Sequence, residues 1–189
     1  MKILDTRLSG VKRIQPAVHE DERGYFLETF QALRYHQMLG LAQPFVQDNC
    51  SHSRHGVLRG LHFQARHPQG KLLRVAHGEI FDVVVDLRTE SATYAQWEGA
   101  VLSDRNHEQL WIPPGFAHGF VVLSESADVT YQCTDYYQSQ DEVCLRWDDP
   151  DLAIAWPIGN PVLSSKDCAG LTLAELRALG RLPRVVQSP

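Results

Sequence analysis

The chain has 189 residues, of which 43% are hydrophobic and 22% are charged, a balance typical of one folded domain with a sizeable core. Its 18 Lys and Arg residues and 23 Asp and Glu residues give a net charge of −5, and no basic run occurs. Proteins that bind the nucleic-acid backbone normally carry a basic face, so we do not expect a nucleic-acid partner. A few Arg and Lys residues can nevertheless form a local positive site for a small anionic ligand.

The N-terminal segment MKILDTRLSGVKRIQP has no apolar stretch of the kind found in secretory signals, and no apolar run is long enough to span a membrane. We therefore expect a cytoplasmic protein whose four scattered cysteines are reduced and mostly packed. A thiolate nucleophile among them is the less favoured alternative. We expect one domain over residues 1–189, with a core to about residue 170, a C-terminal helix and tail over 171–189, and a polar tail after about Pro183.

The strands that we expect are separated by turn residues. In chain order they are Gly24–Glu28, Val57–Gln64, Lys71–Arg88, Trp97–Leu102, Gln109–Ile112, Gly119–Leu123 and Val129–Tyr136. Gly78 and the Pro-Pro-Gly cluster at 113–115 indicate turns. Phe81 and Val83 alternate with Asp82 and Val84, the period of two that is typical of a strand.

Helix is expected to be a minor component. Phe30–Leu39 has helical spacing, with Thr29 as the expected N-cap and Gly40 as the C-cap. Near the C-terminus, Thr172 and Glu175 have the spacing of a capping box and predict a second helix. Many short strands with few helices favour a sandwich, a barrel or a jelly roll, and such a fold can hold a ligand in its mouth.

His62 lies between apolar residues in the strand-like stretch Leu58–Gln64. Taken alone, such a histidine is more often a core residue held by one hydrogen bond than a catalyst. Its charge changes near neutral pH, however, so a small change in its environment makes it a usable base.

A second histidine, His118, follows the Pro-Pro-Gly turn in the stretch Trp111–Phe120 and has small neighbours, which leave room for a ligand. The alternative is a turn that happens to be followed by a histidine. In Leu163–Asp167, Lys166 and Asp167 place a cation beside a carboxylate. Asp167 could orient a histidine ring and Lys166 could meet a phosphate or a carbonyl oxygen, although adjacent Lys and Asp are also common on solvated surfaces.

The stretch Tyr131–Tyr137 carries three tyrosines. In a regular strand Tyr131, Cys133, Asp135 and Tyr137 share one face. A phenol is a plausible proton donor and an aromatic ring is a plausible stacking platform, while the alternative is an ordinary aromatic strand.

A metal centre is not expected. Small β-barrels of the cupin type often bind a metal through a His-x-His pair, a Glu and a later His. Here Gly60 and Gln64 flank His62 where a second histidine would stand, so that His62 and His118 supply two imidazoles at most. A stable site usually needs three protein ligands.

The chain resembles the dTDP-4-dehydrorhamnose 3,5-epimerase family of the deoxysugar pathway. The motifs that carry the resemblance are Asp21–Glu28, Phe45–Ser51, Val57–Gln64, Gly70–Leu72, Gly78–Val83, Trp111–Phe120, Thr134–Tyr137 and Ser165–Asp167. They run in order from about residue 20 to residue 167 and are specific together, whereas each alone is weak. The C-terminal twenty or so residues carry no such motif.

The resemblance implies a mainly β, cupin-like jelly roll (a barrel or sandwich with a few short helices), a homodimer and no cofactor. It implies epimerisation of dTDP-4-dehydro-6-deoxy-D-glucose at C3 and C5 in dTDP-L-rhamnose biosynthesis. It makes His62 the proton acceptor, Asp167 its orienting partner and Tyr131 the proton donor. The residues that it places around the nucleotide-sugar are Arg23, Phe26, Glu28, Gln47, Asp48, Asn49, Arg59, His118, Tyr137, Glu142 and Lys166, with Tyr137 stacking on the thymine. In such dimers the N-terminal strand can cross to the partner, so Arg23 and Glu28 are candidates for the neighbour's site.

The expected chemistry runs through an enolate. A ketone at C4 acidifies the hydrogens on C3 and C5, and His62 would remove one while Asp167 holds its ring. Lys71 is the candidate for stabilising the charge that develops on the oxygen. Inversion requires that Tyr131 return a proton from the opposite face. Enzymes that invert C3 or C5 alone, a ketoisomerase, a metal-dependent cupin oxygenase and a non-catalytic sugar-binding jelly roll are the alternatives.

One conflict remains within this assignment. In a regular strand Arg59 and His62 point to opposite faces, because their separation is odd, yet both are assigned to one ligand. Either a bulge at Gly60 turns Arg59 inward, or Arg59 reaches the ligand around the rim.

Overall fold

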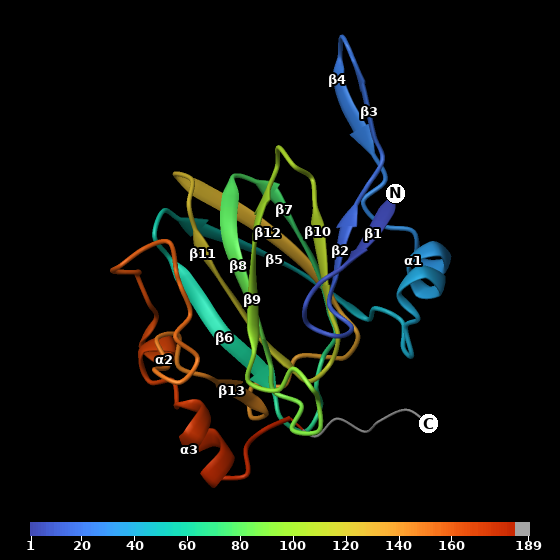
Figure 1. Ribbon diagram of the computed structural model, residues 1–189. Helices are drawn as coiled ribbons and strands as arrows, with labels where there is room; N and C mark the ends of the chain where they lie inside the picture. The colour runs from blue at the N-terminus through green and yellow to red at the C-terminus, as the bar shows by residue number, and fades with distance from the viewer. Residues whose placement is uncertain (184–189) are drawn as a thin grey trace.

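The computed structural model describes residues 1–183, and two antiparallel β-sheets dominate it (Figure 1). The six-stranded sheet has the order β1 (Lys2–Asp5), β2 (Lys12–Gln15), β10 (Gln109–Ile112), β7 (Lys71–His77), β12 (Ser126–Cys133) and β5 (Gln47–Arg54). The five-stranded sheet has the order β13 (Glu142–Cys144), β6 (Leu58–Gln64), β11 (Phe116–Val122), β8 (Glu79–Asp86) and β9 (Trp97–Ser103). The sheets face each other as a sandwich and do not close into a barrel. The polar tail expected after about Pro183 lies outside the described residues.

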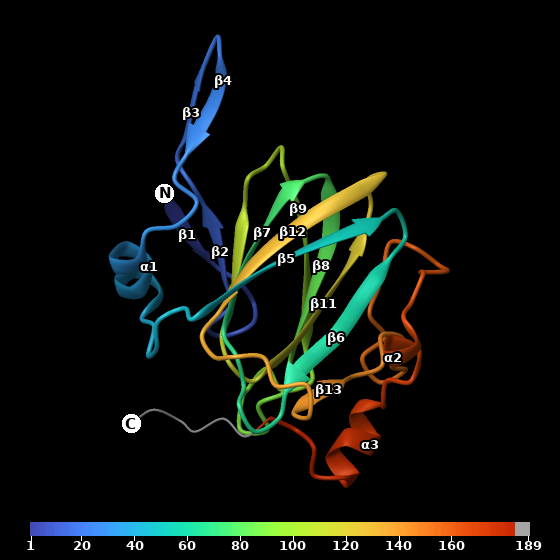
Figure 2. The same cartoon turned by 180° about the vertical axis from the view of Figure 1, so that it is seen from behind.

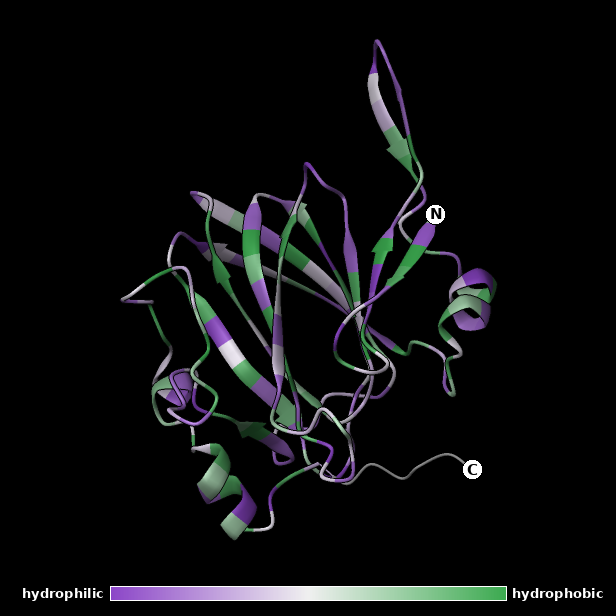
Figure 3. Ribbon diagram, in the orientation of Figure 1, coloured by the Kyte–Doolittle hydropathy of each residue, from purple (hydrophilic) through white to green (hydrophobic). Residues whose placement is uncertain are grey.

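The main core lies between the two sheets. Ile80 and Val84 of β8 point into it, and so do Leu73 of β7 and Val129 of β12. The alternate residues of β8, including Val83, face away and join a second core on the outer side of the five-stranded sheet. β8 is therefore buried on both faces, and the two-residue alternation seen in the sequence separates two hydrophobic layers. Figure 3 shows hydrophilic and hydrophobic bands along β6, with irregular spacing.

The C-terminal segment covers the outer face of the five-stranded sheet. It contains α2 (Ser165–Cys168) and α3 (Leu173–Ala178), which lie beside β6 and β13 in both views (Figures 1 and 2). Leu173 and Leu176 of α3 are buried in the second core. The predicted capping box is present, because the Thr172 side chain accepts from the Glu175 backbone and the Glu175 side chain accepts from the Thr172 backbone.

The helix α1 (Ala32–Leu39) packs against the outer side of the six-stranded sheet through the buried Tyr35. Gly40 ends the helix in the left-handed conformation, as predicted. The N-cap is Gln31 and not Thr29, because the Gln31 side chain accepts the backbone N–H of Arg34 at 2.5 Å. No helix among the described residues is both long and apolar enough to cross a membrane.

A hairpin of β3 (Val18–Asp21) and β4 (Gly24–Leu27) projects from the sandwich (Figures 1 and 2). It pairs with neither large sheet. Its tip is polar, with Arg23 paired to Asp21, whereas Phe26 on β4 is 72% exposed.

Candidate active site

A cavity of about 330 Å³ opens between the two sheets and brings together most of the side chains that the sequence singled out. The predicted site residues that line it are Gln47, Asn49, Arg59, His62, Lys71, His118, Tyr131, Tyr137, Glu142 and Lys166. On β5 the strand alternation turns Gln47 and Asn49 inward and leaves Asp48 on the opposite face. The local register therefore decides which polar residues of this strand reach the cavity.

His62 stands on the inner face of β6, with Leu61 and Phe63 pointing into the outer core. Its Nε2 lies 2.5 Å from Oδ1 of Asp167, a residue 105 positions further along the chain. The predicted pairing of the two is therefore present in the fold. Because Nε2 is engaged by the carboxylate, Nδ1 is the nitrogen left to face a reactant.

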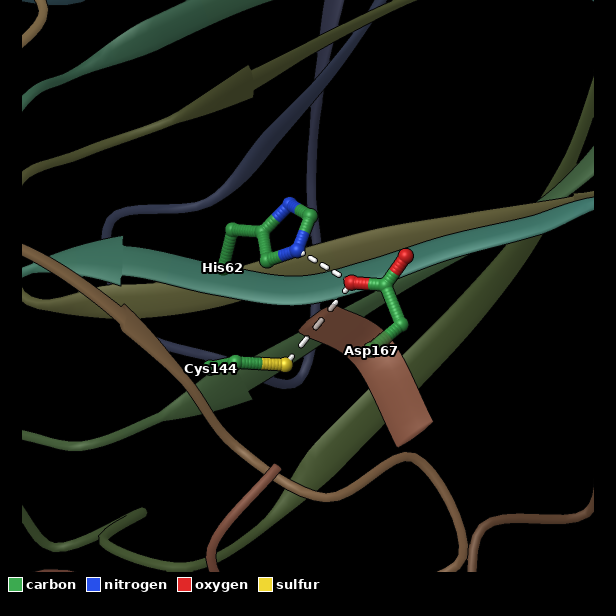
Figure 4. Close-up of side chains that lie close together, drawn as sticks. All are labelled: His62, Cys144 and Asp167. Atoms are coloured by element: carbon green, nitrogen blue, oxygen red, sulfur yellow. Dashed lines mark hydrogen bonds and ion pairs between the residues drawn. The ribbon is translucent and has the colours of Figure 1, made fainter. Parts of the chain in front are cut away.

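Asp167 is 3% exposed and is held from several directions. Its Oδ2 accepts from the Ser164 hydroxyl at 2.7 Å, while Oδ1 also accepts from the Cys144 thiol at 3.8 Å (Figure 4). Burial alone would raise the pKa of Asp167, but the hydrogen bonds with His62 and Ser164 outweigh it and lower the pKa below its usual value. Asp167 is therefore a carboxylate that can fix the His62 ring and balance an imidazolium.

His62, Cys144 and Asp167 present three donor atoms that lie within 4.8 Å of one another. A cysteine binds a metal as its thiolate. Burial, together with the charge of Asp167, raises the pKa of Cys144 to about 12, so its thiol keeps the proton that it donates to the carboxylate. In this structure the three side chains form a hydrogen-bonded chain that ends on the Asp167 carboxylate.

Glu142 lies on the other side of the His62 ring. Its Oε1 is 3.9 Å from Nδ1 of His62, and its Oε2 accepts from Lys166 at 2.8 Å and from the Tyr137 hydroxyl at 2.9 Å. Burial alone would raise the pKa of Glu142, but these cationic and hydroxyl neighbours lower it overall. Glu142 thus links the reactive nitrogen with the side chains at the mouth of the cavity.

Lys71 begins β7 and lines the cavity from the six-stranded sheet. Burial lowers the pKa of Lys71, and the nearby Cys133 and Glu142 oppose this effect only in part. A half-buried amine on the cavity wall, when it is protonated, interacts more strongly with a developing negative charge than one in open water, as the predicted role of Lys71 requires.

Tyr131 enters the same cavity from β12, in the sheet opposite to that of His62. Burial raises the pKa of the Tyr131 phenol, which keeps it protonated at neutral pH. A base and an acid that face each other across one cavity can act on the two faces of a bound carbon.

A second His–Asp pair lines the cavity next to the first. His118 of β11 is the cross-strand partner of His62, and its Nε2 lies 2.7 Å from Oδ2 of Asp82 on β8. Asp82 is fully buried, which raises its pKa, although His118 partly counteracts the effect. Asp82 was not predicted as a site residue. Its signal in the sequence, one carboxylate within an apolar strand, was interpreted only as strand alternation.

Five predicted residues do not line the cavity, among them Asp167, which contacts it only through His62. Arg23 and Phe26 lie on the projecting hairpin, and Glu28, just beyond it, pairs with Arg34 of α1 at 2.5 Å. Asp48 faces a smaller pocket on the outer side of the six-stranded sheet. The sequence also did not single out Ser164 or Cys144, which act on Asp167 and not directly on the cavity.

These groups can remove a proton from one face of a carbon and return one to the other face, which is the chemistry of an epimerase. A family model described as dTDP-4-dehydrorhamnose 3,5-epimerase matches residues 5–175. The chain belongs to that family, and the sequence-based prediction of the family and of an isomerase is confirmed.

Two curated relatives of this description illustrate the similarity. One from Methanothermobacter thermautotrophicus is 51% identical over 88% of this chain and 91% of its own length. One from Neisseria gonorrhoeae is 51% identical over 93% of this chain, which spans about half (53%) of that relative's length.

A solved structure extends the similarity to the fold. The dTDP-6-deoxy-D-glucose-3,5-epimerase RmlC from Legionella pneumophila, in complex with dTDP-4-keto-L-rhamnose, is 50% identical to this chain. It superposes with a TM-score of 0.93 and covers 98% of each chain. The predicted mainly β, cupin-like jelly roll is confirmed, in the sandwich form and not as a closed barrel.

Proposed function

We propose that this protein epimerises dTDP-4-dehydro-6-deoxy-D-glucose at C3 and C5 to dTDP-4-dehydro-L-rhamnose, without a cofactor, in dTDP-L-rhamnose biosynthesis. Membership of the family supports the substrate class. The observation that carries the mechanism is that His62 and Tyr131 line one cavity from facing sheets.

The first half of each inversion uses the His62–Asp167 pair. Nδ1 of His62 takes the proton from the carbon next to the C4 ketone, and the electron pair of the C–H bond moves to the C4 oxygen as an enolate. Asp167, hydrogen-bonded to Nε2, keeps the ring in place and stabilises the imidazolium. Lys71 supplies positive charge for the enolate oxygen.

The second half uses Tyr131. Its phenol gives a proton to the opposite face of the same carbon, the enolate electron pair forms the new C–H bond, and the configuration is inverted. Because a positioned acid or base contributes about 10²–10⁴-fold each, this pair accounts for a large share of the rate.

The nucleotide end is assigned to the mouth of the cavity, where Tyr137 and Lys166 are exposed beside Glu142. The Tyr137 ring is the stacking surface for the thymine, and the cations Arg59 and Lys166 suit the diphosphate. Gln47, Asn49 and His118 complete the polar lining. This division leaves His62 and Lys71 for the sugar.

The projecting hairpin is assigned to a homodimer. Arg23, Phe26 and Glu28 lie outside the cavity of their own chain and are exposed. A hairpin that reaches a second copy would carry these residues to the partner's cavity, which explains why family motifs occur on an element distant from the site. In this assembly the partners of the protein are a dTDP-sugar and a second identical chain.

The test is incubation with dTDP-4-keto-6-deoxyglucose in heavy water, with NMR used to follow deuterium at C3 and C5. We expect label at both carbons and an L-configured product. Label at one carbon alone would indicate an epimerase for that position, a shifted carbonyl would indicate a ketoisomerase, and no label at either carbon would contradict the enolate route. Elemental analysis for iron is the matching test of the oxygenase alternative.

A further inference from the structure

Two successive inversions at one site require that the base and the acid return to their starting protonation states in between. This inference rests on the proposed function. After the first inversion His62 carries the proton taken from carbon, and Tyr131 is a phenolate. Neither can act again until His62 has lost a proton and Tyr131 has regained one. The site therefore needs a route by which a proton leaves His62 while the sugar stays bound.

Asp167 cannot provide this route. It is 3% exposed, its Oδ1 is engaged by His62 at 2.5 Å and by the Cys144 thiol, and its Oδ2 is engaged by the Ser164 hydroxyl at 2.7 Å. Ser164 is exposed, but its hydroxyl and the Cys144 thiol both donate to the carboxylate, so neither is placed to accept a proton from it. Asp167 is also bonded to Nε2, whereas the proton taken from the substrate arrives on the other nitrogen.

Glu142 differs from Asp167 in the His62 nitrogen that it faces and in the exposure of its partners. Its Oε1 lies 3.9 Å from Nδ1, the nitrogen that receives the substrate proton. Its Oε2 contacts Lys166 at 2.8 Å and the Tyr137 hydroxyl at 2.9 Å, and these two residues are about half exposed at the mouth of the cavity. The two nitrogens of His62 thus meet two different carboxylates: Nε2 meets the buried Asp167, and Nδ1 meets Glu142, whose partners are half exposed at the mouth of the cavity.

The pairing of β13 with β6 accounts for the position of Glu142. Glu142 is the first residue of β13, whose Cys144 pairs with His62 on β6, so Glu142 and Cys144 are two residues apart on one strand. Residues separated by two share a face, and diagonal neighbours on adjacent strands are within reach of long side chains. The backbone of β13 therefore holds Glu142 beside the ring.

We propose that Glu142 is the proton exit of His62, and that it resets the base between the inversions at the two carbons. A transfer needs hydrogen-bond reach of about 3 Å or one bridging water, so the gap closes by a small movement of the Glu142 side chain or by one water. The imidazolium Nδ1–H bond breaks, the carboxylate accepts the proton and releases it to solvent, and His62 returns to its neutral form. The Tyr131 phenolate takes a proton from water, so each cycle exchanges one carbon-bound hydrogen and leaves the enzyme charge unchanged.

The test is a single-turnover experiment with the full-length Glu142→Gln variant in heavy water, in which deuterium at C3 and at C5 is measured separately over time. The amide keeps the size and hydrogen-bonding capacity of the side chain but cannot carry a proton. We expect the first inversion to stay within about tenfold of the wild-type rate and the second to slow by about 10²-fold, so that a singly inverted, singly labelled sugar accumulates.

Two further measurements separate proton transfer from a structural role. Added formate should restore the second inversion in Glu142→Gln, because a small carboxylate can replace the missing acceptor, whereas it cannot repair a misplaced ring. Glu142→Asp keeps a carboxylate, so its second inversion should be faster than that of Glu142→Gln.

Equal slowing of both inversions in Glu142→Gln, or no accumulation of the singly inverted sugar, would overturn the relay. So would a defect that formate leaves unchanged. Failure of the proposed function looks different, because then the wild-type protein itself would not introduce deuterium at both carbons.

Discussion

Arg59 and His62 line the same cavity although they are three residues apart on β6. The register explains this arrangement. His118 pairs with His62 and Phe120 pairs with Arg59, so one residue of β11 lies opposite two residues of β6. This is a β-bulge, which turns Arg59 inward and resolves the conflict left by the sequence. Arg59 is then held by Ser53 and by the His52 carbonyl.

Gly60→Ala tests this bulge. Gly60 has a φ of +123°, and a Cβ there would lie 2.6 Å from the Gly119 Cα and 2.8 Å from the His118 carbonyl oxygen. Backbone strain of this kind costs about 1–3 kcal/mol, and the contact with rigid backbone adds to it. We expect a loss of at least about 2 kcal/mol in the free energy of unfolding, measured with urea, and a lower turnover because Arg59 and His62 move.

Gly159→Ala is the matched control. A Cβ at Gly159 has no heavy atom within 4 Å, and its φ is not in the left-handed region. We expect unfolding and turnover within error of the wild type. If Gly60→Ala behaved in the same way, the bulge would not be needed to position Arg59.

His62→Ala should reduce turnover by about 10²–10⁴-fold, the contribution of a positioned base. Deuterium exchange at C3 and C5 should fall in parallel, since both inversions use the same nitrogen. The side chain is partly exposed to the cavity, so the variant should still fold and bind dTDP. Calorimetric titration with dTDP checks this, and near-normal turnover would contradict the role of His62.

The sequence predicts strands best where one face is apolar. The alternation in β8 and the terminal residues Gly40 and Thr172 were interpreted correctly because each rests on a local physical signal. β5 was not predicted. Its sequence QDNCSHSR is polar on both faces, since one face lines a polar cavity and the other is exposed, so it lacks the hydrophobic period of a strand. β1 and β2, short strands at a sheet edge, were missed as well.

The residues of the site also differ in whether the sequence carries a local signal for them. No local rule relates His62 to a carboxylate 105 residues away, and their pairing was predicted only through the resemblance. Asp82 was missed for a related reason. The side chain that makes it useful, His118, is 36 residues distant, and only the pairing of β8 with β11 brings the two together.

Asp167→Asn tests how much the ionised Asp167 carboxylate contributes to the stability of the folded protein. The pKa of Asp167 is lowered in the folded protein. Its ionisation therefore stabilises the folded state fully at pH values above the unfolded pKa of about 3.9. This stabilisation is lost as the pH falls through the lower pKa of the folded state. The asparagine does not ionise. We expect the wild type to be more stable by about 2 kcal/mol at pH 7, a difference that shrinks below about pH 4. Urea unfolding at several pH values measures it, and a difference that grew on acidification would be inconsistent with a paired carboxylate.

Cys144 should resist alkylation. With a pKa of about 12, its thiolate fraction at pH 8 is on the order of 10⁻⁴, and the thiolate is the reactive form. Cys168 is exposed and serves as the internal reference. Treatment of the folded protein with iodoacetamide, followed by peptide mass spectrometry, should find Cys168 modified long before Cys144. Comparable rates would mean that the thiol is not held beside Asp167.

Subunit mixing tests whether the hairpin acts in the partner's cavity. Arg23→Ala and His62→Ala should each be nearly inactive as homodimers. In a mixed dimer the intact Arg23 of the His62→Ala chain would reach the cavity of the other chain, whose His62 is intact, and one complete site would form. Random exchange makes half of the dimers mixed, so activity should recover to roughly a quarter of the wild-type value. If Arg23 served its own cavity, every site in the mixture would lack one of the two residues, and activity would stay at the level of the separate variants.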